Sequence, residues 1–226
     1  MEIIKNIEDL NKFRSNYDQI SFVPTMGNLH KGHMALIDKA RSYDSHVTAS
    51  IFINPLQFND ASDFNNYPKS LDDDITLLSK HGCDSLFVPD SSILENIKEI
   101  KASDTALYLC GMNRPGHFDG VLTIVNKLFE ITKPTRSFFG KKDFQQLILI
   151  KNFVKENNLP IEIISVDTVR EQNGLAMSSR NNRLSESDRE KASILYKTLS
   201  SIKDNSNNLS NEMIMSYKDE LTKQGF

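Results

Sequence analysis

Residues 20–33 read ISFVPTMGNLHKGH, and this stretch decides the fold. Its apolar run, ISFV, is followed by a turn with two glycines, and residues 34–41 continue with a helical pattern. Continuous apolar runs are typical of strands buried on both faces, as in a parallel sheet. The stretch therefore predicts a strand, a ligand-binding loop at the carboxyl end of that strand, and a helix.

The same alternation of strand and helix recurs along the chain. Further strands are expected at residues 47–53, 85–88, 137–139 and 161–166. Helical spacing appears after Asn6, which is a candidate cap, and again at residues 121–131 and 144–154. Ser70 and Asp73 resemble a capping box that opens another helix. Strands that alternate with helices predict an α/β fold with a doubly wound parallel sheet.

The pattern changes near Thr168. A polar turn at residues 171–174 precedes a helical pattern at 187–199, an Asn- and Ser-rich stretch at 204–211, and a final amphipathic pattern. We therefore expect two domains, residues 1–167 and residues 168–226.

Composition excludes several classes of protein. The 226 residues carry a net charge of −3, from 27 basic and 30 acidic side chains, which argues against a bulk nucleic-acid binder. No apolar run approaches the roughly 18 residues that a membrane span needs, and the first ten residues do not resemble a signal peptide. Two cysteines do not indicate a disulfide scaffold. We expect a cytoplasmic protein with no membrane or nucleic-acid partner.

The turn that holds His30, Gly32 and His33 carries the clearest chemistry. Imidazoles donate hydrogen bonds to phosphate oxygens, and the start of the following helix offers N–H groups to the same anion. Fixed donors of this kind are what nucleotidyl transfer requires. The ordinary alternatives are a surface histidine beside a capping histidine, or a zinc site, for which no third ligand stands out. The chain has no GxxxxGK[ST] sequence, so a nucleotide would need a different phosphate device.

Other polar residues also follow expected strands or open expected helices. Gln57 suits a substrate with hydroxyl and carboxylate groups, and the lysines of residues 140–143 suit a nucleotide phosphate. Two serines and an arginine at 178–180 suit a polyphosphate. Asp73 and Asp74 either favour the helix dipole or lie near Mg²⁺, directly or through water. Each of these segments, taken alone, also fits an ordinary solvated loop or helix start.

Taken in order, these segments resemble the pantothenate synthetase family of pantoate–β-alanine ligases, within the HxGH nucleotidyltransferase superfamily. The resemblance rests on residues 24–33, 53–58, 67–68, 114–118, 142–146 and 177–181, and it covers most of the chain. It implies a Rossmann-like domain with a smaller C-terminal lid, a homodimer, and ATP with Mg²⁺. It also implies that pantoate reacts with ATP to give pantoyl adenylate, from which β-alanine displaces AMP to form pantothenate, a precursor in the coenzyme A pathway.

The resemblance also assigns site residues by position. It makes His33, His30 and Lys142 catalytic, with His33 as the acid. Gln57 and Gln146 would bind pantoate, and Gln57 would also bind β-alanine. The implied ATP site comprises Met26, Gly27, Asn28, Leu29, His30, Lys31, Gly32, His33, Gly140, Lys141, Lys142, Asp143, Val169, Met177, Ser178, Ser179 and Arg180.

Two departures from the family pattern are visible. Lys141 stands where relatives usually have Glu, and the extra cation would either tighten phosphate binding or weaken a local contact. The family also continues past the position of Phe226, so the implied lid at 168–226 is incomplete relative to the family. The alternatives are another adenylyltransferase of the superfamily, which would leave AMP on its product, and a non-catalytic ligand-binding module.

Overall fold

The computed structural model describes residues 1–226, which divide into two compact units. The first unit is Met1–Asp167 and the second is Thr168–Phe226. The division falls where the sequence pattern changes.

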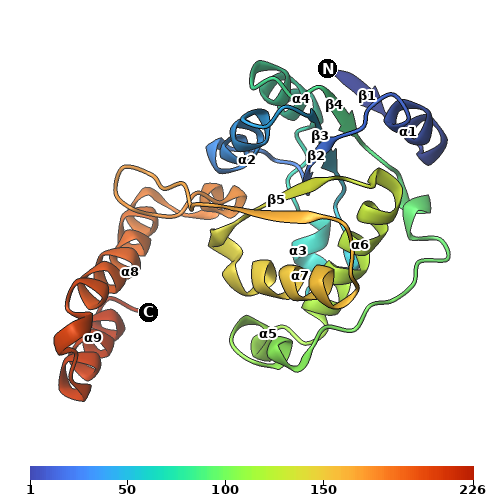
Figure 1. Cartoon of the computed structure of the whole chain (residues 1–226). Helices are drawn as coiled ribbons and strands as arrows, with labels where there is room; N and C mark the ends of the chain where they lie inside the picture. Colours follow the sequence, from blue (N-terminus) through green and yellow to red (C-terminus); the bar gives the residue numbers. More distant parts are fainter. The chain divides into compact units, whose positions relative to one another are not determined.

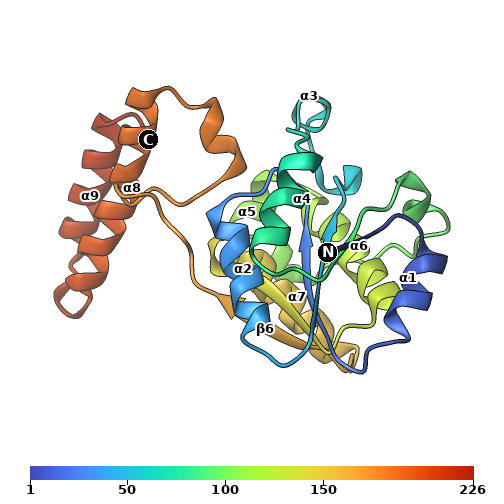
Figure 2. The ribbon, with the colours of Figure 1, turned by 90° about the horizontal axis from the view of Figure 1, so that it is seen from above.

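The first unit is built on a six-stranded parallel sheet, of which β1 to β5 are labelled in Figure 1 and β6 in Figure 2. Its strands are β1 (Glu2–Ile4), β2 (Ile20–Thr25), β3 (His46–Ile51), β4 (Ser85–Phe87), β5 (Arg136–Gly140) and β6 (Glu162–Val166), in the order β1-β4-β3-β2-β5-β6. The expected α/β fold and the five expected strands are confirmed. β1 was not predicted, because this edge strand has three residues and two of them are exposed.

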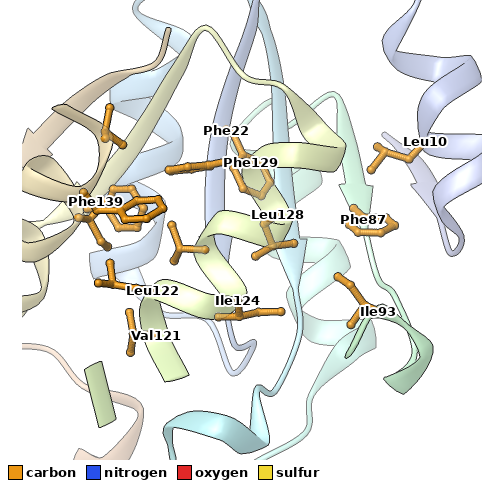
Figure 3. Packing of buried hydrophobic residues seen from close by; sticks show 14 of the residues in the cluster. Leu10, Phe22, Phe87, Ile93, Val121, Leu122, Ile124, Leu128, Phe129 and Phe139 are labelled. Atoms are coloured by element: carbon orange, nitrogen blue, oxygen red, sulfur yellow. The ribbon is translucent and has the colours of Figure 1, made fainter. Parts of the chain in front are cut away.

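Helices cover both faces of the sheet, which explains the continuous apolar runs (Figures 1 and 2). Phe22 packs on one face against α1 (Ile7–Arg14), α6 (His117–Thr132) and α7 (Phe144–Glu156), and Figure 3 shows part of this cluster. The next residue, Val23, packs on the other face against α2 (Lys31–Arg41) and α4 (Leu71–Lys80). Successive strand residues point to opposite faces, so a strand between two helical layers is apolar throughout.

Short helices occupy the connections that follow β3, β4 and β5. They are η1 (Pro55–Gln57), α3 (Ala61–Asn65), η2 (Ser91–Leu94), η3 (Asp104–Leu107), α5 (Cys110–Asn113) and η4 (Lys141–Asp143). Polar residues at the carboxyl ends of the strands therefore lie on short, defined turns.

The two predicted helix starts have different outcomes. Asn6 caps α1, because its side chain accepts the backbone N–H of Asp9 at 2.8 Å. The predicted capping box at Ser70 and Asp73 is wrong, because Ser70 precedes α4 without a side-chain cap bond. Its hydroxyl donates instead to Oδ1 of Asp74 at 3.2 Å.

The second unit contains η5 (Ser179–Arg183), α8 (Glu186–Asp204), η6 (Ser206–Asn208) and α9 (Asn211–Lys223), and α8 packs against α9. α8 extends past the expected end at residue 199. The buried residues of this unit are all polar: Asn181, Ser193 and Thr198. Across the whole chain, no helix is both long enough and apolar enough to span a membrane.

Candidate active site

The strand order reverses at β2, so a ligand-binding crevice is expected at the carboxyl end of this strand. The chain passes from β2 to β3 on one side, whereas β5 pairs with β2 on the other side. Ligands of open α/β sheets bind where the strand order reverses in this way. Residues 26–30, after β2, and residues 140–143, at the end of β5 and directly after it, flank this point.

The imidazoles of His30 and His33 accept backbone N–H groups at the start of α2. Nδ1 of His30 accepts the N–H of Gly32 at 3.1 Å, and Nδ1 of His33 accepts the N–H of His30 at 3.2 Å. The ring centroids are 4.1 Å apart. Because each Nδ1 accepts a hydrogen bond, each neutral ring carries its proton on Nε2. The expectation that this helix start offers unpaired N–H groups is wrong for Gly32 and for His30, whose N–H groups are partnered by the rings.

The surroundings of both rings oppose protonation. Burial lowers the pKa of His33 to about 3, assisted by the nearby His30 and by the charge of Lys142. Burial and then Lys142 also lower the pKa of His30. The structure therefore brings together His30 and His33, from the start of α2, and Lys142, from η4 after β5, as two neutral Nε2–H donors beside a cation.

A buried carboxylate lies behind this turn. Asp74 is 2% exposed, and its two oxygens accept the N–H groups of Asn28 and Leu29, each at 2.8 Å. The pKa of Asp74 lies above its usual value because burial raises it. The two backbone hydrogen bonds and the one from Ser70 lower the pKa and offset only part of this rise. From the sequence, Asp74 was a candidate metal ligand, and its contact with the loop was not predicted.

Gln57 ends η1 and is fixed by several contacts. Its Nε2 donates to Sδ of Met26 at 3.1 Å, and its Oε1 accepts from Nδ2 of Asn54 at 3.1 Å. Its carbonyl oxygen lies 2.7 Å from Nδ1 of His117. Met26 and Gln57, from two separate loops, are therefore in contact at the edge where β2 and β3 end.

Asn54 and His117 hold η1 in place, and the sequence analysis assigned no role to either residue. Asn54 is 1% exposed and also donates to the carbonyl of Gly120 at 3.0 Å, which ties η1 to α6. The signal in the sequence was the Asn-Pro pair directly after a strand, which is typical of a fixed turn.

The loop after β5 holds three charged side chains. Lys141 pairs with Asp167, at 2.6 Å, and Lys142 lies 3.5 Å from Asp143. Lys141 therefore already has an anionic partner on the last residue of the first unit. Gln146 lies half-buried in the first turn of α7, and the neighbouring Gln145 instead fixes the loop at residues 105–110.

The remaining predicted residues belong to the second unit. Val169 and Met177 are joined by a backbone hydrogen bond of 3.0 Å, so they lie on paired segments. Ser178 caps η5 by accepting the N–H of Arg180 at 3.2 Å. Buried Asn181 donates to Glu171 at 2.9 Å and to the carbonyl of Ala176 at 3.0 Å, which fastens both ends of the loop at 177–180.

The predicted metal residues do not form a cage. No three His, Cys, Asp or Glu side chains gather in a geometry that could hold an ion. Asp73 is exposed, and both oxygens of Asp74 are engaged by backbone N–H groups. The residues present do not fit a protein-held Mg²⁺ site at this position.

The reversed strand order, the His-x-Gly-His turn and the adjacent lysine define a Rossmann-like α/β protein with a candidate phosphate-binding site where the strand order reverses. The family model described as "Pantoate-beta-alanine ligase" matches residues 2–226. The chain belongs to this family of pantoate–β-alanine ligases.

Individual relatives agree with this assignment. Pantothenate synthetase of Acinetobacter baylyi is 46% identical over 194 residues, which cover 84% of this chain and 69% of that protein. The enzyme of Stutzerimonas stutzeri is 46% identical, with 90% of this chain and 74% of the relative covered.

Solved structures show the same likeness. The crystal structure of pantothenate synthetase from Thermus thermophilus superposes with a TM-score of 0.92 at 37% identity, and covers 99% of this chain and 83% of that one. Pantoate-β-alanine ligase from Francisella tularensis, complexed with β,γ ATP and β-alanine, gives a TM-score of 0.89 at 39% identity, with 100% and 86% covered. The expected family, fold and enzyme class are confirmed.

Proposed function

We propose that this ATP-dependent pantoate–β-alanine ligase forms pantoyl adenylate at the point where β2 and β5 diverge. A pantoate carboxylate oxygen attacks the α-phosphorus of ATP, and the bond to the β-phosphate oxygen breaks to release pyrophosphate. The amine of β-alanine then attacks the acyl carbon, the C–O bond to AMP breaks, and the amine gives up its proton as pantothenate forms.

The observation that carries the proposal is the pair of fixed imidazoles beside Lys142. Both rings accept backbone N–H groups at Nδ1, so each directs an Nε2–H that stays available at neutral pH. Preorganised donors stabilise charge that develops on phosphoryl oxygens without reorganisation during the reaction. In this proposal His33 acts as a neutral hydrogen-bond donor, because a ring with a pKa of about 3 is not protonated in neutral solution.

The proposed substrate contacts follow from the same loops. Residues 26–33 and 140–143 bind ATP, with Lys142 on a phosphate, and Gln57 and Gln146 bind pantoate. Gln57 also approaches β-alanine. Its side-chain amide, fixed by Met26 and Asn54, presents both a donor and an acceptor at the end of β3. Val169 and residues 177–180 of the second unit, the proposed lid, are assigned to ATP by family resemblance.

Magnesium and a homodimer remain predictions of the resemblance, and a cytoplasmic location remains a prediction of the sequence pattern. Mg²⁺ usually binds through substrate phosphates with few protein ligands, so it would reach the site on the nucleotide.

The test uses ATP, Mg²⁺, pantoate and β-alanine, with nucleotide products separated by chromatography. We expect AMP and pyrophosphate in equal amounts, and pantoate-dependent exchange of pyrophosphate into ATP when β-alanine is omitted. Release of ADP would exclude the adenylate route. A product that retains AMP would favour another adenylyltransferase of the superfamily.

The imidazole donor is tested by His33→Ala, with His81→Ala as the matched control. His81 lies at the end of α4, where it pairs with Asp38 at 2.7 Å, outside the proposed site. Loss of a preorganised donor typically costs about 10²–10³ in kcat, so His33→Ala should fall by that factor while the control stays near the parent. Equal activity of the two variants would remove His33 from the mechanism.

A further inference from the structure

Asp74 faces the loop at residues 27–29, whose backbone conformation directs N–H groups toward a negative charge. Gly27 and Asn28 have φ values of +79° and +49°, both in the left-handed region. Such a turn points consecutive N–H groups to the same side and forms a concave site for a negative charge. Here the N–H groups of Asn28 and Leu29 both reach the carboxylate of Asp74, at 2.8 Å.

The carboxylate belongs to α4, which places it behind the loop. Ser70, one turn earlier, donates its hydroxyl to Oδ1 of Asp74, so three donors surround the group. A Cβ added at Gly27 would lie 3.1 Å from Oδ2 of Asp74, which shows how closely the backbone approaches the carboxylate. Glycine at this position permits both the left-handed turn and the close approach.

The same contacts count against Asp74 as a metal ligand. Both of its oxygens accept backbone N–H groups, and the side chain is 2% exposed. Asp73, the neighbouring residue, is exposed and makes neither contact. A ligand to Mg²⁺ would have to direct oxygen lone pairs to the ion, in near-ideal octahedral geometry.

We propose that Asp74 is a positioning residue and not a ligand to Mg²⁺. It holds the backbone of residues 27–29, and this backbone sets where the imidazoles at the start of α2 lie relative to the nucleotide. The proposal rests on the proposed function, in which residues 26–33 bind ATP. The loop leads directly into His30, so a shift at Asn28 and Leu29 displaces a ring whose Nε2–H is a phosphate donor in the proposed function.

The test separates positioning from metal binding by measuring nucleotide affinity with and without the metal. Calorimetry with ATP is carried out in EDTA and in excess Mg²⁺ on the full chain, on Asp74→Asn and on Asp73→Asn. An asparagine offers one acceptor and turns an N–H₂ group toward a backbone N–H. We expect Asp74→Asn to raise the Kd for ATP at least tenfold in both buffers. Asp73→Asn should stay within twofold of the parent in both.

The opposite outcomes overturn the proposal. If Asp74→Asn binds ATP normally in EDTA and loses affinity only with Mg²⁺, the residue acts through the metal. If its affinity equals that of the parent in both buffers, the loop does not depend on Asp74.

A measurement on the parent protein covers the case in which Asp74→Asn fails to fold. Amide hydrogen exchange should show Asn28 and Leu29 protected although they lie in a loop, because both N–H groups are bonded to a buried carboxylate. Exchange at the rate of a free loop would contradict the positioning contact. A parent that does not bind ATP in either buffer would instead remove the ATP role of residues 26–33, and the exchange result would still decide the contact.

Discussion

At the residue scale, the two histidines of the His-x-Gly-His turn differ from ordinary surface imidazoles. Each ring uses Nδ1 as an acceptor for a backbone N–H at the start of α2. The sequence predicted donors to phosphate at this position, but it could not predict their protonation state. That state depends on burial and on Lys142, which is over a hundred residues away in the chain.

His33 should remain neutral between pH 8 and pH 5. Burial lowers its pKa to about 3, so its ring protons should not shift in NMR spectra recorded between pH 8 and 5. The urea-unfolded protein is the control, because its histidines titrate at about 6.5. A His33 signal that titrates between pH 6 and 7 in the folded protein would contradict this prediction.

The same shift makes stability depend on pH. The folded pKa of His33 lies below the unfolded value, so the unfolded chain takes up the proton first as the pH falls below about 6.5, and stability decreases. The slope is about 1.4 kcal/mol per pH unit, so the contribution of His33 at pH 5 is a loss of about 2 kcal/mol.

Urea unfolding at pH 7 and pH 5 measures this loss, with His33→Gln as the comparison. The variant should lose less stability than the parent over that interval. Burial also lowers the pKa values of His30 and His46, and both groups are present in parent and variant, so the difference between the two proteins reports mainly on His33. Identical losses in parent and variant would be inconsistent with a depressed His33 pKa.

At the element scale, α6 approaches η1 so closely that only glycine fits at residue 120. A Cβ there would lie 2.1 Å from the carbonyl oxygen of Leu56 and 2.9 Å from the nitrogen of Gln57. Both of these atoms are backbone, so the two elements would have to separate. The sequence did not indicate this contact, because glycine inside a helical pattern is also compatible with simple tolerance.

Gly120→Ala should therefore lower the free energy of unfolding by about 1–3 kcal/mol, the usual cost of overpacking, or more because backbone must move. It should also raise the KM for pantoate, since Gln57 is part of the displaced turn. Gly140→Ala is the stability control, because its added Cβ would have only one neighbour, at 3.9 Å. Urea unfolding of both variants measures the difference, and equal stabilities would contradict the close approach.

The starts of α1 and α4 show when a local sequence pattern correctly predicts a helix cap. Asn6 was a correct cap because its side chain bonds within the same turn, a contact that sequence spacing specifies. Ser70 had the same kind of spacing, yet its hydroxyl bonds to Asp74, whose carboxylate is occupied by the loop after β2. The hydroxyl therefore bonds to a side chain one turn further along α4, and not to a backbone N–H of the first turn.

At the scale of the whole molecule, the two units differ in how they are stabilised. The first unit buries two apolar clusters, one on each face of its sheet. The second has no buried apolar side chain, and its α8 and α9 leave large residues such as Leu199 and Met215 exposed. Burial of apolar area is the main favourable term in folding, so the second unit should open more readily.

Hydrogen exchange on the intact chain tests this difference. Amides of β2, β3 and β5 should exchange orders of magnitude more slowly than those of α8 and α9, since the latter open without disturbing an apolar core. Comparable protection in both units would show that they open together.

The sequence by itself determined the class of fold, five of the six strands and the family, because apolar runs, turn glycines and the order of polar motifs are local properties of the chain. Only the tertiary structure decided that β5 lies beside β2, that the rings of His30 and His33 stay neutral next to Lys142, and that Asp74 faces a backbone loop. These features depend on desolvation and on contacts between residues distant in the chain, which local patterns do not encode.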